Sequence, residues 1–210
     1  MALQIQGQTL KTGAPGPSFP QDQQGALLAT ELNPRYYQNI YQNQTFAAQV
    51  ANANPTGVTT GILGAAGTPL LLVWNPAGTG KNLVILNAVV AGRNNGTVSP
   101  GSFVWSAGLT TAITANLSTP INLLNYQLTG SVAKFVANAA ATGLSALNYI
   151  RPITGMGAGT TATTTGFQQA FEDTAGSILV PPGAAAAIIS TVTGTAAVVD
   201  AGITWVEVNI

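Results

Sequence analysis

The chain contains no cysteine and no histidine among its 210 residues. Without cysteine it can form no disulfide and no thiolate metal site, and without histidine it lacks the usual nitrogen ligand of zinc. The absence of histidine also excludes every catalytic triad that uses an imidazole base. We therefore expect no metal centre and no cofactor of the common kinds.

Charged residues are also scarce. Six basic and six acidic side chains make up 6% of the chain and cancel to a net charge of zero, whereas an average soluble domain is about 25% charged. The basic residues stand singly, and nucleic-acid binding needs Lys and Arg gathered on one surface. We expect no nucleic-acid partner. Near-zero net charge promotes association, so we expect a subunit that buries surface against other proteins.

One apolar stretch, residues 183–199, approaches the length of a membrane span. It includes Ser190, Thr191 and Thr193, and no basic residue flanks it. These features favour two β-strands around Gly194 over a membrane helix. The first twenty residues lack the basic start and apolar core of a signal peptide. No membrane association is expected.

What the chain does have is apolar material divided by turn formers. Hydrophobic residues make up 46% of it, together with 24 Gly and 12 Pro. After about residue 45, short apolar or alternating runs recur between Gly, Pro and Asn, which is typical of strands and turns. Helical signals are confined to 119–128 and 139–146. The pattern predicts an all-β domain over 46–210, a sandwich, jelly roll or barrel. Strands are predicted at 46–51, 58–63, 69–74, 82–91, 102–109, 132–137, 147–153, 167–172, 177–180, 185–192 and 202–210.

The last predicted strand, 202–210, alternates regularly. Its odd-numbered face carries Trp205 and Glu207, and its even-numbered face carries Val206 and Val208. Because the odd-numbered face holds an acidic side chain, we expect the even-numbered face to point into the core. Trp205 would then lie at an interface or at the edge of a layer.

Residues 1–45 differ from the rest, being rich in Gln, Asn, Pro and Gly. The proline-rich run 13–20 cannot form a helix interior or a central strand, which favours an extended N-terminal arm; a disordered tail is the alternative. Tyr and Arg are enriched at the energetic centres of interfaces. We therefore predict that the arm binds a partner through a small group of residues near its end, Pro34, Arg35, Tyr36, Tyr37 and Tyr41.

The stretch WNPAGTGKN has the outline of a nucleotide-binding loop. The motif G-x-x-x-x-G-K-[ST] places Gly and Ser or Thr where this chain has Asn75 and Asn82. The run that follows is rich in β-branched residues, so no helix N-terminus is available for a phosphate. We predict instead a hairpin connection, in which Gly78 and Gly80 adopt positive φ and Lys81 restarts the strand from a solvated position.

No constellation of residues indicates catalysis. Glu172 and Asp173 are adjacent, and neighbours on a strand point to opposite faces, so they cannot act together as a glycosidase pair. Trp74, Trp105 and Trp205 could stack on sugars, but each lies in an apolar run, which favours core packing. We expect no catalytic residue and no small-molecule substrate.

Several segments together resemble a known family. The arm ends in PRYY, a strand ends in WNPAGTGKNLVIL, a late segment is ILVPPGAAAAIIS, and the chain closes on GITWVEV. This combination, spread over most of residues 34–210, resembles β-rich structural proteins of tailed bacteriophages, particularly the jelly-roll cement or decoration proteins of the capsid. The resemblance implies a jelly-roll β-sandwich, a homotrimer on the virion surface, and bridging of major capsid subunits through the β-domain and the arm.

Two other interpretations remain open. One is a tail, baseplate or fibre component that takes part in host attachment. The other is a cellular carbohydrate-binding or surface-layer β-domain. An enzyme is not expected.

Overall fold

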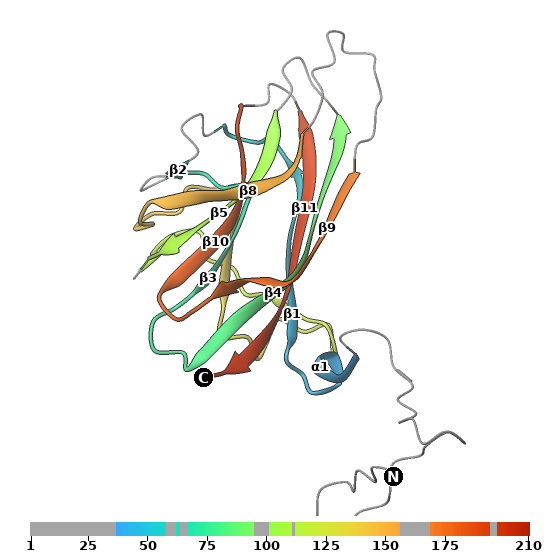
Figure 1. Cartoon of the computed structure of the whole chain (residues 1–210), viewed down its shortest axis with the longest axis vertical. Coiled ribbons are helices and arrows are strands. Elements are labelled where there is room, and N and C mark those ends of the chain that lie inside the picture. Colours follow the sequence, from blue (N-terminus) through green and yellow to red (C-terminus); the bar gives the residue numbers. More distant parts are fainter. Residues whose placement is uncertain are drawn as a thin grey trace, which may run out of the picture. The chain divides into compact units, whose positions relative to one another are not determined.

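The protein is an all-β sandwich, as the sequence predicts; the described residues also form one short helix, α1 (Tyr37–Tyr41), which the sequence did not indicate. A computed structural model provides its structure, and Figure 1 shows the two sheets packed against each other. The described residues are 37–57, 62–63, 67–94, 101–110, 112–155, 169–193 and 197–210.

All strand pairings within the two sheets are antiparallel. The first sheet has the order β6-β1-β11-β4-β9, and the second has the order β2-β8-β5-β10-β3-β7. The strands of the first sheet are β1 (Thr45–Ala53), β4 (Lys81–Asn94), β6 (Ile121–Asn122), β9 (Gln169–Val180) and β11 (Val198–Asn209). Those of the second are β2 (Ile62–Leu63), β3 (Leu71–Asn75), β5 (Ser102–Leu109), β7 (Lys134–Ala137), β8 (Leu147–Gly155) and β10 (Ala184–Ser190).

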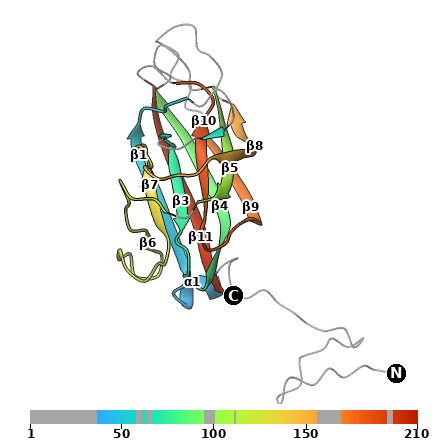
Figure 2. The ribbon, with the colours of Figure 1, turned by 90° about the vertical axis from the view of Figure 1, so that its left-hand side faces the viewer.

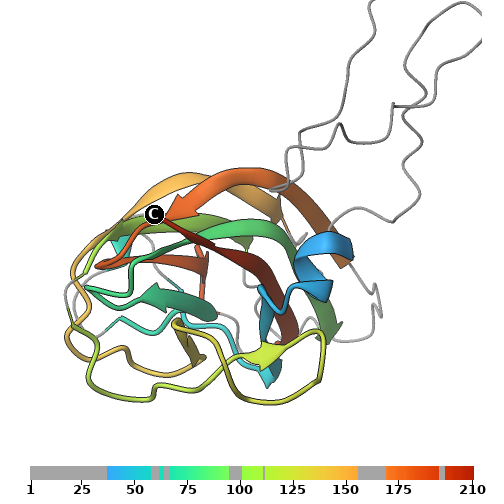
Figure 3. The ribbon, with the colours of Figure 1, turned by 90° about the horizontal axis from the view of Figure 1, so that it is seen from below.

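The connectivity is that of a jelly roll. When the short strands β2, β6 and β7 are set aside, the two sheets read β1-β11-β4-β9 and β8-β5-β10-β3. Every connection between successive long strands crosses from one sheet to the other, except the one from β5 to β8. Two four-stranded sheets wound in this way are the double-sheet jelly roll. The two layers are seen end-on in Figure 3.

The WNPAGTGKN stretch is one of these crossings and not a hairpin, because β3 and β4 belong to different sheets. Gly78 and Gly80 adopt positive φ values of 79° and 66°, as predicted. The buried amide of Asn75 donates hydrogen bonds to the carbonyl oxygens of Lys81 (2.8 Å) and Val180 (2.9 Å). The prediction of a hairpin was wrong because a turn sequence does not specify which sheet the next strand joins.

Asn75 also joins this crossing to a second one. Its carbonyl oxygen accepts a hydrogen bond from the Gly183 amide at 2.8 Å. Gly183 has φ 79° and lies in the tight turn between β9 and β10, where the Ala184 amide donates to the Pro181 carbonyl at 3.1 Å. The asparagine that breaks the nucleotide-binding motif therefore ties two sheet crossings together at one end of the sandwich.

The main core lies between the sheets and is built around four large aromatic side chains, Phe46, Phe103, Trp105 and Trp205. The rings of Phe46 and Trp205 pack with their centroids 6.4 Å apart. Trp205 belongs to the odd-numbered face of β11, so the prediction that the even-numbered face points inward was wrong. Val208 on that face is exposed.

A second apolar cluster covers the other face of the second sheet. Residues of β3, β5 and β10 pack there against Ile113, Ala141 and Leu144, which come from irregular segments. The helix expected at 139–146 is absent: this stretch is irregular, and Gly143 adopts φ 87°. The helix expected at 119–128 is also absent, since β6 and a turn stand in its place. The central strands of the second sheet are thus buried on both faces. The first sheet covers one face, and irregular chain covers the other.

The apolar run 183–199 divides between strands, as predicted. β10 and the start of β11 lie within it, but they belong to different sheets and do not pair with each other. In the part of the chain that the structure describes, no helix has the length and hydropathy needed to cross a membrane.

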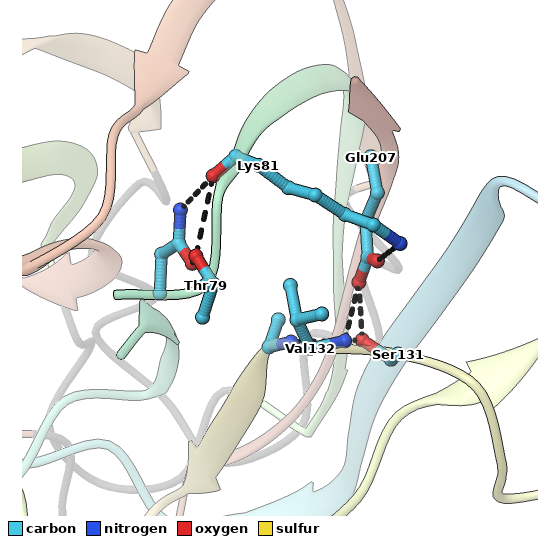
Figure 4. A network of polar contacts seen from close by, with 7 residues as sticks. Thr79, Lys81, Ser131, Val132 and Glu207 are labelled. Atoms are coloured by element: carbon cyan, nitrogen blue, oxygen red, sulfur yellow. Dashed lines mark hydrogen bonds and ion pairs between the residues drawn. The ribbon is translucent and has the colours of Figure 1, made fainter. Parts of the chain in front are cut away.

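A buried carboxylate joins three chain segments near the C-terminal end of β11 (Figure 4). The side chain of Glu207 has no exposed surface, and it pairs with the ammonium group of Lys81 at 3.1 Å. It also accepts hydrogen bonds from the Ser131 hydroxyl (2.6 Å) and the Val132 amide (2.9 Å). Lys81 begins β4 and residues 131–132 lead into β7, so Glu207 links the two sheets. The side chain of Lys81 is 31% exposed, and it is committed to this ion pair.

Glu207→Ala should lower the free energy of unfolding by about 3 kcal/mol, because it leaves a buried donor set without its acceptor. Glu207→Gln should cost less, since an amide oxygen can still accept from Ser131 and Val132. Chemical denaturation measures both. Arg93→Ala is the control: it breaks the Arg93–Asp200 pair, which is 3.0 Å long and half-exposed, and should cost about 1 kcal/mol or less. Equal losses for Glu207→Ala and Arg93→Ala would contradict this role of Glu207.

Candidate interaction surface

Several buried polar groups have structural partners, whereas others, such as the Trp205 indole N–H and the Ser106 hydroxyl, have none among the described residues. Trp105 of β5 donates its indole N–H to the Glu172 carboxylate of β9 at 2.6 Å. The other oxygen of Glu172 pairs with Arg151 of β8 at 2.7 Å. These three residues fasten the edge of one sheet to the other where β8 and β9 lie across the sandwich. Asp173, the neighbour of Glu172, is exposed, so the two carboxylates do not face a common site.

A further ion pair joins the neighbouring strands β4 and β11. Arg93 contacts Asp200 at 3.0 Å, and the same carboxylate accepts a hydrogen bond from the Asn52 amide at 2.8 Å. Among the described residues, no group of three or more acidic side chains could hold a metal ion. The charges that the sequence scatters are therefore used mainly to join strands.

The three tryptophans are buried, as their apolar runs predict, and the separate expectation that Trp205 lies at an interface or at the edge of a layer was wrong. Trp105 and Trp205 lie in the main core, and Trp74 lies in the second cluster, where its indole N–H donates to the Thr110 carbonyl at 3.1 Å. None of these rings is available to stack on a sugar.

The predicted arm residues lie largely outside the described part of the chain. Pro34, Arg35 and Tyr36 are not described, and Tyr37 is described only as the first residue of α1. Tyr41 ends α1 and is 67% exposed. The helix ends in a tight turn, where Asn43 adopts φ 62° and the Gln44 amide donates to the Asn39 carbonyl at 3.0 Å. The role of this group in binding stays a prediction.

The outer face of the first sheet differs from that of the second. Its central residues come mainly from β1, β11 and β4 and are mostly small or uncharged, and the described chain leaves them half-buried or exposed. Two acidic residues share this face: the exposed Asp173 opposite Asn87, and Asp200 opposite Ala91, which pairs with Arg93. Phe171 of β9, which pairs with Val89, is 64% exposed on the same face. We call this surface the open face, and its central residues are Ala47, Gln49, Ala51, Asn87, Val89, Ala91, Phe171, Gly202 and Thr204.

The open face is hollowed above Gly202. Two depressions of about 310 and 290 Å³ share Gln49, Val89 and Gly202 in their lining. A Cβ atom built on Gly202 would meet only the Ala48 carbonyl, at an ordinary 3.8 Å. Internal packing therefore does not require glycine at this position. Glycine in a strand interior often marks a place where a ligand or another backbone approaches closely.

A rigid turn projects beside the open face. Residues 122–128, which we call the β6 turn, follow directly from β6 at the edge of the sandwich, near β1 and β7 in Figure 2. Tyr126 is 75% exposed and Leu128 is 64% exposed, and Leu124 is also exposed. Tyr126 adopts φ 57°, which is uncommon for a bulky residue.

Hydrogen bonds within the β6 turn hold this conformation. The backbone amide of Tyr126 donates to the Asn122 carbonyl at 2.9 Å. The backbone amide of Leu124 donates to the Asn122 side-chain oxygen at 2.8 Å. The Asn122 amide donates to the Gln127 carbonyl at 2.9 Å, and the Gln127 amide donates to the Asn125 side chain at 3.0 Å. Sequence reasoning missed this turn because its leucines suggested a helix.

Glu172→Ala should destabilise the protein by about 2 kcal/mol, because the buried indole N–H of Trp105 loses its acceptor. Glu172→Gln keeps an oxygen for Trp105 and loses only the pairing with Arg151, which is partly exposed, so it should cost under about 1 kcal/mol. Thermal and urea denaturation give both values. If the glutamine variant is as unstable as the alanine variant, the ion pair and not the indole bond is the important contact.

This architecture has to be interpreted from its own surfaces. No family model, no curated protein and no solved structure matches the chain. A jelly roll hosts unrelated functions, so the fold alone does not determine what this protein does. The function depends on the two sheet faces, the β6 turn and the arm.

Proposed function

We propose that this protein is a virion structural protein, a capsid cement or decoration protein of a tailed bacteriophage. In this proposal it sits on the outer shell as a homotrimer and bridges major capsid subunits through its β-domain and N-terminal arm. The observation that carries the proposal is the contrast between the two sheets. The central strands of one sheet are buried on both faces, and the other sheet presents a hollowed outer face that is mostly uncharged.

The fold supports a structural role. Double-sheet jelly rolls are common in viral capsid and lectin domains. The antiparallel sheets are fastened to each other by Glu207 and by Trp105 with Glu172, which gives a rigid body. A rigid body loses little conformational entropy when it docks.

The open face supports association. The outward surface of an antiparallel sheet is normally polar when it faces water. Here it combines Ala, Val and Gly with a largely exposed Phe171. Exposure of these apolar side chains to water is unfavourable. The burial of apolar area is the main favourable term in protein association. A shell lattice offers repeated subunits to cover it.

The arm adds a second, separate contact in this proposal. A segment that becomes ordered on docking extends the interface, at an entropic cost. Its aromatic and basic group, from Pro34 to Tyr41, has the composition of an interface centre. The first strand begins at Thr45, which is buried, and the Gln44 carbonyl accepts the Glu207 amide at 2.9 Å. A truncation that tests the arm must therefore stop before β1.

Removal of residues 1–36 should leave a folded β-domain with strongly reduced binding to capsids. The test uses particles stripped of the native protein, to which full-length and truncated chains are added, with occupancy measured by cryo-EM. Circular dichroism and the melting temperature check that the truncated chain is folded. Full occupancy by the truncated chain would show that the arm does not contribute to binding.

The alternative is a tail, baseplate or fibre component that takes part in host attachment. The exposed aromatic side chains of Phe171 and Tyr126 favour it, because aromatic rings of this kind can contact a receptor. Copy number in purified virions separates the two proposals. Hundreds of copies per particle are expected for a shell protein, and a dozen or fewer would assign the protein to the tail.

A further inference from the structure

We propose that the β6 turn is a self-association element, which inserts Tyr126 of one copy into the depression above Gly202 on the open face of a second copy. The inference rests on the self-association in the proposed function and names the contact that produces it. It does not depend on the capsid, so it can be tested with the purified chain.

The β6 turn is preorganised for insertion. Tyr126 is held at φ 57° by a set of hydrogen bonds within the turn, although such a conformation is unfavourable for a side chain of its size. Strain of this kind persists where the surroundings impose it, and it is concentrated at functional positions. The ring therefore projects from a fixed backbone, with Leu124 and Leu128 on the same turn, and little entropy is lost on docking.

The depression has the size and chemistry to receive this ring. Its volume of about 290 Å³ exceeds the cavity of roughly 150 Å³ that accepts benzene in an engineered protein interior. Ala47, Val89 and Gly202 give it apolar walls, and Asn87 and Thr204 also line it. A phenol ring prefers such a site, with an apolar body and a polar partner for its hydroxyl.

Charge favours a second copy as the occupant. No residue of the β6 turn is charged, and no residue that lines the 290 Å³ depression is charged. The whole chain has zero net charge, so two copies do not repel each other. A partner that relies on charged groups would find nothing complementary on either element.

The positions of the two elements allow the contact to repeat. Ile121 and Leu123 line the depression, and the β6 turn continues from them. Turn and depression thus adjoin on each molecule. In a two-fold dimer each copy would insert its turn into the other, and in a ring each copy would insert into the next.

The test is the oligomeric state of the purified full-length chain, measured by sedimentation velocity over a range of concentrations. Tyr126→Asn removes the ring and keeps a residue that tolerates positive φ. Gly202→Val fills the depression from the other side, and the sheet should accept it because a Cβ atom at this position meets only the Ala48 carbonyl at 3.8 Å. Each variant should raise the dissociation constant at least tenfold, as loss of an interface anchor does.

Tyr149→Thr is the matched control, because it removes a half-exposed tyrosine from β8 of the other sheet and should leave association unchanged. Because the chain has no cysteine, Gln127→Cys chains, which keep Tyr126 and carry the thiol on the exposed residue beside it, can be mixed with Gln49→Cys chains of different tag length and treated with a short thiol crosslinker. A crosslinked product that contains both tags is expected. Melting temperatures confirm that every variant is folded.

Three outcomes would overturn the inference. The first is a wild-type chain that remains monomeric at high concentration. The second is an oligomer that Tyr126→Asn and Gly202→Val leave intact. The third is a monomeric chain whose capsid binding is lost with Tyr126→Asn, which would assign the turn to the shell. Failure of capsid binding by all chains, with self-association intact, would instead overturn the proposed function alone.

Discussion

The carboxylate of Glu207 has to be satisfied inside the protein, and much of the local architecture follows from this constraint. A buried carboxylate without partners is costly, and the effective penalty amounts to several kcal/mol per ion. Three donors meet it here: Lys81 at the start of β4, and the Ser131 hydroxyl and the Val132 amide ahead of β7. Their positions determine where β4 begins and how the chain that leads to β7 lies against β11. The nearby crossing from β3 to β4 is held in turn by Asn75.

The two sheets solve the problem of exposed apolar surface in different ways. The second sheet is covered by irregular chain of the same molecule, with Ile113, Ala141 and Leu144 packed on it. The first sheet carries mostly small or uncharged side chains at the centre of its outer face. With 6% charged residues in the whole chain, there is little charge available to make that face strongly hydrophilic. The low charge of the sequence and the open face of the structure are thus two aspects of one property.

Most strands could be predicted from the sequence because short apolar runs between Gly, Pro and Asn are local signals. Several local signals misled, among them those for helices at 119–128 and 139–146. The strands expected at 167–172 and 177–180 are one strand, β9, which continues through an irregularity where Ala175 and Gly176 adopt positive φ. Sheet membership was not predictable, since a turn such as WNPAGTGKN suits a hairpin as well as a crossing.

The candidate surface was the least predictable part. The inward direction of Glu207 depends on donors that lie 126, 76 and 75 residues away in the chain, and no local pattern reveals them. The open face combines residues from β1, β4 and β11, which only the topology brings together. Gly202 was a usable signal, because a glycine inside an alternating strand needs a reason. The sequence could not show that Gly202 lies at the bottom of a depression, because the fold brings Gln49 and Val89 beside it.

The pairing of the first long strand with the last has a consequence for how the chain matures. β1 pairs with β11 along most of its length, and β11 also forms the link to β4. During synthesis, the first sheet therefore lacks its central strand until β11 leaves the ribosome. Contacts between segments so distant in sequence also slow folding, because a long loop must close before they form. The nascent chain must keep its apolar strands from pairing with those of other chains until β11 has been made, and only then can the sandwich close.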